Sequence, residues 1–78
     1  MLETRLVKIL SNSLGVTDSE INSDTSMESL DAWDSLAHLS VVITIEEEFE
    51  ISLNEEEILR MTSFSEIFEL LKSKNLEN

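Results

Sequence analysis

The chain has 78 residues and no cysteine, and 17 acidic against five basic side chains give a formal net charge of −12. A chain of this length forms one modest core, which excludes a large catalytic cleft between domains, a disulfide framework and a thiolate metal site. The charge makes nucleic acid a poor partner and favours either a basic protein surface or an acidic surface that only solvates the domain.

Residues 1–78 are predicted to form a single domain, because the sequence has no proline, one glycine and no internal repeat or linker. The longest apolar run, residues 41–45, is too short to span a membrane. The first ten residues lack the apolar block and cleavage site of a signal peptide. We therefore expect a cytoplasmic protein without a transmembrane segment.

The first predicted element is a helix over residues 2–14, where leucine and isoleucine recur at three- and four-residue spacing. Gly15 follows as a C-terminal cap. Thr17 and Glu20 have the spacing of a capping box around one short turn. Residues 16–34 are predicted to be a long loop anchored to the bundle by isolated apolar residues, which are Val16, Ile21, Met27 and Leu30.

A second helix is predicted from Asp34 and Ser35 to about Glu48, with Phe49 closing it. The β-branched cluster at residues 41–45 would also suit a strand, but the length and flanks favour a helix. The predicted core stripe is Val41, Val42, Ile45 and Phe49, and the opposite side is Ser40, Thr44, Glu47 and Glu48.

An additional apolar strip lies on the boundary between these two sides. Its members are Leu36, Leu39 and Ile43, and Glu46 and Glu47 flank it. This apolar arc is wider than packing against one core would require. Such an arc either packs against a further helix or contacts a partner protein.

Two more helices follow from capping patterns. Asn54 with Glu57, and Ser63 with Glu66, have capping-box spacing, which predicts a short helix near residues 55–60 and another near 64–73. Their buried faces are predicted to comprise Ile58, Leu59, Phe64, Ile67, Phe68 and Leu71. The pattern is therefore all-α.

Most active-site chemistry lacks parts in this sequence. His38 falls near the inward side of the second helix, where a partly buried, hydrogen-bonded histidine is more common than a catalytic one. A hydrolase site of Ser35, His38 and Asp34 is disfavoured, since no G-x-S-x-G motif or oxyanion pocket is evident. Residues 22–34 lack the calcium-loop spacing, so loose divalent-cation binding stays open but no metal site is predicted.

Ser35 stands at a helix start, where free backbone N–H groups and the positive end of the helix dipole favour a bound or attached phosphate. A plain helix cap, in which Asp34 or Ser35 accepts those N–H bonds, explains the same residues. The residues alone leave both interpretations open.

The chain resembles the acyl carrier protein family, which includes peptidyl and aryl carrier domains. The family's hallmark Asp-Ser-Leu corresponds to Asp34, Ser35 and Leu36. The likeness covers nearly the whole chain, including LGV after the first helix, EEEFEI at residues 46–51 and MTSF before the last helix. The resemblance implies a four-helix bundle of acyl-carrier type, with a long loop between the first two helices and a short third helix.

The same resemblance implies a carrier and not an enzyme. It implies that Ser35 bears a covalent 4′-phosphopantetheine, transferred from coenzyme A by a separate magnesium-dependent phosphopantetheinyl transferase. The thiol of that arm would carry acyl or aminoacyl groups as thioesters between enzymes. Asp34 and Leu36 complete the attachment motif.

The expected partners are the transferase and the loading and downstream biosynthetic enzymes, with basic docking surfaces that meet a monomeric carrier. The predicted partner-binding residues are Leu36, Leu39, Ile43, Glu46, Glu47 and Trp33. For Trp33, packing over the first turn of the second helix is an alternative to partner contact.

Two departures from the family pattern leave the pathway open. Ala32 stands where many members have glycine and is followed by Trp33, and Ala37 and His38 replace acids common after the serine. The WDSL motif is more similar to stand-alone carriers of specialised pathways than to the housekeeping fatty-acid form. The competing hypothesis is a non-catalytic acidic helical interaction module without the prosthetic group.

Overall fold

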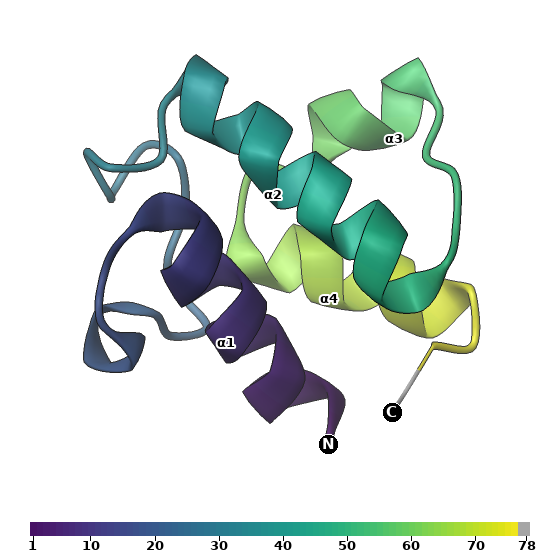
Figure 1. Ribbon diagram of the computed structural model, residues 1–78, viewed down its shortest axis with the longest axis horizontal. Coiled ribbons are helices and arrows are strands. Elements are labelled where there is room, and N and C mark those ends of the chain that lie inside the picture. Colours follow the sequence, from purple (N-terminus) through teal and green to yellow (C-terminus); the bar gives the residue numbers. More distant parts are fainter. Residues whose placement is uncertain (77–78) are drawn as a thin grey trace.

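The computed structural model describes residues 1–76, and within them the chain is helical. It forms α1 (Leu2–Leu14), a 3₁₀ turn η1 (Asp18–Glu20), α2 (Ser35–Phe49), α3 (Glu55–Arg60) and α4 (Phe64–Ser73). Figure 1 shows α2 crossing the middle of the molecule, with α1 on one side and α3 on the other. The predicted all-α architecture, with its long loop and short third helix, is confirmed.

The helix bounds follow from capping residues. Gly15 ends α1 in the left-handed conformation, with φ of 70°, and its N–H donates to the carbonyl of Ser11. Asn54 begins α3 and Ser63 begins α4, and each side chain accepts an N–H bond from the glutamate three residues later. These contacts satisfy backbone groups that a helix end leaves without partners, which explains why the capping patterns predicted the bounds.

The core lies between α1, α2 and α4 and takes one face from each. Buried leucine and isoleucine residues of α1 and α4 meet the predicted stripe of α2, where Val41, Val42 and Ile45 are buried and Phe49 is partly buried. Among the residues that the structure describes, the largest side chains that are almost completely enclosed are those of Trp33, Leu6, Leu10, Ile45, Met61, Ile67, Leu71 and Val41. Burial of this apolar surface is the main term that stabilises the fold.

The loop between α1 and α2 is anchored as predicted. Ile21 is buried, and Val16, Met27 and Leu30 pack against the core. The loop also bonds to the α3–α4 connection, because the N–H of Met27 donates to the carbonyl of Thr62 at 2.9 Å. This long segment is therefore held close to the start of α2.

Two predicted orientations are wrong. Leu59 was expected to be buried, but it is 72% exposed, because adjacent residues project about 100° apart around a helix and α3 turns Ile58 toward the core. Thr44 was expected on the outer side of α2, but it is partly buried and bonds to the hydroxyl of Ser13 in α1 at 3.2 Å. The side of α2 that carries Thr44 therefore faces α1.

Candidate functional site

Ser35 is the first residue of α2 and is exposed. The residue that caps the helix is Asp34, whose Oδ1 accepts the N–H of Ala37 at 2.8 Å. Within residues 1–76 the Ser35 hydroxyl has no hydrogen bond. The two roles that the sequence left open are thus divided between neighbours, with Asp34 as the cap and Ser35 presenting a free hydroxyl.

The surroundings of this hydroxyl suit a phosphate. The first N–H groups of an α-helix have no intrahelical acceptor and carry the positive end of the helix dipole. Asp34 takes the N–H of Ala37, while the N–H groups of Ser35 and Leu36 lie in the same first turn without an intrahelical acceptor. An exposed hydroxyl beside such donors can hold the phosphate of 4′-phosphopantetheine, so Ser35, Asp34 and Leu36 fit this group.

Trp33 lies in the core and not on the surface, with 1% of its side chain exposed. The prediction that it contacts partner proteins is therefore corrected, and the alternative of intramolecular packing is what the structure shows. The large apolar ring is enclosed, and its N–H finds a partner in Nδ1 of His38 at 3.1 Å. A buried tryptophan N–H needs such an acceptor.

The sequence pattern predicted a partly buried, hydrogen-bonded histidine, and His38 is buried with a hydrogen bond at each ring nitrogen. Nδ1 accepts from Trp33, and Nε2 lies 2.9 Å from the carbonyl oxygen of Ile58. Neither nitrogen is available to take a proton from Ser35. This geometry gives a physical reason against the hydrolase arrangement.

A mainly apolar groove opens beside Ser35, between the first half of α2 and α3. Its volume is about 310 Å³. Its lining residues are Met27, Ser35, His38, Leu39, Ile58, Leu59 and Thr62. The α3 side of this groove could not be predicted from the sequence, because no spacing pattern relates α3 to α2.

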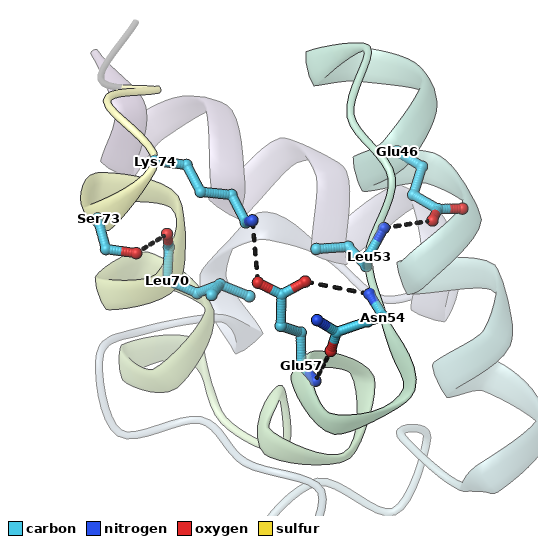
Figure 2. Close-up of polar contacts among 7 residues, drawn as sticks. All are labelled: Glu46, Leu53, Asn54, Glu57, Leu70, Ser73 and Lys74. Atoms are coloured by element: carbon cyan, nitrogen blue, oxygen red, sulfur yellow. Dashed lines mark hydrogen bonds and ion pairs between the residues drawn. The ribbon is translucent and has the colours of Figure 1, made fainter.

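The additional apolar strip of α2 faces outward in the structure. Leu36, Leu39 and Ile43 are 77%, 55% and 54% exposed, so no helix within residues 1–76 covers them. Glu47 is exposed beside them, whereas the carboxylate of Glu46 accepts the N–H of Leu53 at 2.8 Å (Figure 2). Glu46 thus has a structural contact in addition to its place at the edge of the strip.

Residues 1–76 contain no cluster of three or more histidine, cysteine, aspartate or glutamate side chains arranged to hold a metal ion. None of the helices described is long and apolar enough to cross a membrane.

Known proteins share both the sequence pattern and the fold. Residues 4–71 match the family model described as a phosphopantetheine attachment site. The chain is 33% identical over 72 residues to an acyl carrier protein of Buchnera aphidicola subsp. Baizongia pistaciae (strain Bp), and the aligned region covers 91% of each chain. A solution NMR structure of holo acyl carrier protein from Geobacter metallireducens has the same fold, with a TM-score of 0.81 and 22% identity, over 94% of this chain and 84% of that one. The chain therefore belongs to the acyl carrier protein family, whose members are non-catalytic carriers with a phosphopantetheine attachment site.

Proposed function

We propose that Ser35 is the attachment point of 4′-phosphopantetheine and that the protein carries acyl or aminoacyl groups between enzymes. The observation that carries this proposal is the free, exposed hydroxyl of Ser35 at the first position of α2, next to a separate helix cap at Asp34. A serine needed only as a cap would accept the N–H bond that Asp34 accepts instead.

Attachment is a group transfer in which the Ser35 oxygen forms a bond to the phosphorus next to the pantetheine of coenzyme A. The P–O bond of the diphosphate breaks, and adenosine 3′,5′-bisphosphate leaves. The hydroxyl proton passes to a base of the transferase. Within residues 1–76 no base is hydrogen-bonded to the Ser35 hydroxyl, and both ring nitrogens of the single histidine, His38, already have partners. When bound, the arm supplies the thiol that this cysteine-free chain lacks, and that thiol carries the cargo as a thioester.

The surface around Ser35 supports contact with basic partner enzymes. Leu36, Leu39 and Ile43 are exposed on α2, and Glu47 lies beside them. An apolar patch with an acidic border suits a partner with an apolar contact ringed by lysine or arginine, since opposite charges steer the encounter and fix orientation. We assign this role to the transferase and to loading and downstream biosynthetic enzymes, which would meet a monomeric carrier in the cytoplasm.

Modification by a purified transferase tests the proposal. The protein, coenzyme A, magnesium and a broad-specificity phosphopantetheinyl transferase are incubated, and intact mass is measured. We expect one added phosphopantetheine on the wild type and none on Ser35→Ala. Ser40→Ala is the matched control, because Ser40 is an exposed serine of the same helix outside the Asp-Ser-Leu motif.

Two outcomes contradict the assignment. If the folded wild type gains no mass with transferases of both fatty-acid and secondary-metabolism type, the carrier proposal fails and the acidic interaction module takes its place. If Ser35→Ala is still modified, the attachment site lies at another serine. Ser26 and Ser29, whose side chains bond to each other and to nearby backbone, are the next positions to replace.

A further inference from the structure

Trp33, His38 and Ile58 are joined by two hydrogen bonds that link the loop before α2, α2 itself and α3. Nε1 of Trp33 lies 3.1 Å from Nδ1 of His38, and Nε2 of His38 lies 2.9 Å from the carbonyl oxygen of Ile58. An indole nitrogen can only donate, so Nδ1 must accept. The proton of the neutral ring is therefore on Nε2, which donates to Ile58. We call this chain of contacts the Trp33–His38–Ile58 relay.

The bond to Ile58 completes the end of α3. The last carbonyls of a helix have no intrahelical donor, and that of Ile58 otherwise receives only the N–H of Met61 at 3.3 Å. His38 supplies a shorter bond from a different helix. The histidine thus acts as a side-chain cap of α3 delivered by α2.

α3 depends on such contacts more than the other α-helices do. It has six residues and no buried one, and isolated helices of this length are not stable in water. Other polar contacts hold its N-terminal side, where Glu46 accepts the N–H of Leu53 and Lys74 pairs with Glu57 at 2.9 Å (Figure 2). At the end of α3 near Ser35, His38 supplies the hydrogen bond to α2, Ile58 packs against the core, and the carbonyl of Thr62 accepts the N–H of Met27.

The relay therefore helps to hold one wall of the groove beside Ser35. α2 contributes Ser35, His38 and Leu39 to this groove, and α3 contributes Ile58 and Leu59. The Leu59 side chain is 72% exposed, so α3 adds an apolar group to the outward face that already carries Leu39. The bond between His38 and Ile58 thus contributes to the position of Leu59 relative to Ser35.

We propose that Trp33 and His38 are positioning residues, which hold α3 so that a partner enzyme meets Leu59 and Ser35 as one surface. Neither side chain touches the partner. Trp33 sets the tautomer and orientation of the His38 ring, and His38 sets the position of α3. The inference rests on the proposed function, because it assigns the relay a role in recognition of the carrier by enzymes that act at Ser35.

The relay leaves the reacting group itself unchanged. The Ser35 hydroxyl bonds to none of the three residues of the relay, and Asp34 caps α2 independently through Ala37. Loss of the relay should therefore weaken binding of the carrier by the transferase and leave the chemical step alone. In kinetic terms, KM for the carrier rises while kcat is kept.

NMR tests the relay without any modification chemistry. The chain has one tryptophan and one histidine, so each gives a single set of side-chain signals. In the Ser35→Ala protein we expect histidine ¹⁵N shifts of the Nε2–H tautomer and a slowly exchanging indole N–H. The Ile58 amide donates to the carbonyl of Asn54 within α3, so its exchange reports opening of this helix. His38→Leu, which removes the bond to the Ile58 carbonyl, should speed that exchange about fivefold, the factor that one hydrogen bond contributes to an equilibrium. An Nδ1–H tautomer, or unchanged exchange in the variant, overturns the relay.

Transferase kinetics test the role in recognition. We expect KM for the carrier to rise about fivefold in Trp33→Phe, which keeps an aromatic group but removes the N–H donor, and in His38→Leu. His38→Gln, which can still donate to Ile58, should give a KM closer to that of the wild type. Leu59→Ala should raise KM similarly without disturbing the core, because the side chain is exposed. Phe68→Leu is the control. Phe68 is partly buried and lines a different cavity, together with Met1 and Lys72, so this variant should keep the wild-type KM.

The outcomes separate this inference from the carrier assignment. Failure of every transferase to modify the wild type contradicts the carrier assignment, while the NMR measurements still decide whether the relay exists. Modification of folded Leu59→Ala with wild-type KM overturns the inference even if the relay variants unfold. A fall in kcat at constant KM also overturns the inference. So does a loss of modification in Trp33→Phe and His38→Leu that is no larger than their unfolded fraction.

Discussion

Nζ of Lys74 lies 2.9 Å from Oε2 of Glu57, and this ion pair joins the end of α4 to the middle of α3 (Figure 2). The same carboxylate accepts the backbone N–H of Asn54 at 3.0 Å through its other oxygen. Lys74 and this N–H hold the pKa of Glu57 below its ordinary value. The charged form of Glu57 is therefore favoured in the folded protein.

The first prediction concerns the pH dependence of this contact. A carboxyl group whose pKa is lowered by folding stabilises the fold above its ordinary value, which is about 4.3 for glutamate, and loses that contribution as pH falls through the lowered value. The stability difference between wild type and Glu57→Gln should thus be largest at neutral pH and shrink below about pH 4. Urea unfolding across this range measures it.

The control for that experiment is Glu69→Gln, an exposed change of the same charge on α4. It is needed because acid also relieves the repulsion within a chain of net charge −12, which raises stability as pH falls. Subtracting the stability change of Glu69→Gln from that of Glu57→Gln at each pH isolates the contribution of the Glu57 contact. A difference that stays constant with pH would show that the ion pair does not favour the charged form.

The helix bounds could be predicted because each depends on residues close in sequence. Gly15, Asn54 and Ser63 act within four residues of the helix ends that they fix, so their spacing is visible in the sequence. Apolar periodicity in α2 likewise separated the buried stripe from the exposed strip. Such local rules gave the four helices and the exposure of Leu36, Leu39 and Ile43.

The features that were missed depend on contacts between distant segments. The orientation of α3 could not be predicted, since six residues contain too little periodicity to tell Ile58 from Leu59. Trp33 lies in a loop, where no repeat indicates burial. The partner of His38 is 20 residues away in the sequence, so its residue type predicted a hydrogen bond but not the role of capping α3.

A second prediction concerns the end of α1. Gly15 has φ of 70°, where side chains other than glycine are strained, although an added Cβ meets nothing within 4 Å. Gly15→Ala should therefore lower the free energy of unfolding by about 1 kcal/mol through backbone strain alone. Glu50 ends α2 at φ of 54° while carrying a side chain, so Glu50→Gly should change stability in the opposite direction. Thermal and urea unfolding measure both, and equal signs would contradict this explanation.

A third prediction tests the acidic border of the exposed strip. Glu47 is exposed and its side chain has no hydrogen bond or ion pair within residues 1–76, so its replacement should leave the fold intact. Glu47→Lys should slow association with a basic transferase about threefold at low salt, because a rim charge acts mainly on the encounter rate. Stopped-flow or surface-binding kinetics at two salt concentrations measures the change, which should diminish as salt screens it.

Charge reversal elsewhere provides the control for this prediction. Glu69→Lys changes the net charge equally on α4 and should have the smaller effect on the association rate. Glu46→Ala should instead lower stability, because it removes the side chain that accepts the N–H of Leu53. Equal rates for Glu47→Lys and Glu69→Lys would show that overall charge, and not this face, guides the partner.

The last prediction separates the two neighbours at the start of α2. Asp34→Ala removes the side chain that accepts the N–H of Ala37, and the loss of such a cap costs about 1 kcal/mol of stability. Ser35→Ala should cost only a few tenths of that, because the Ser35 hydroxyl makes no hydrogen bond within residues 1–76. Chemical denaturation gives the stabilities, and intact mass after incubation with coenzyme A and a transferase gives the modification. Ser35→Ala should lose modification with nearly unchanged stability, while folded Asp34→Ala loses stability and still presents the hydroxyl. If Ser35→Ala proves the less stable of the two, the serine is the cap after all, and the division of roles between these residues is wrong.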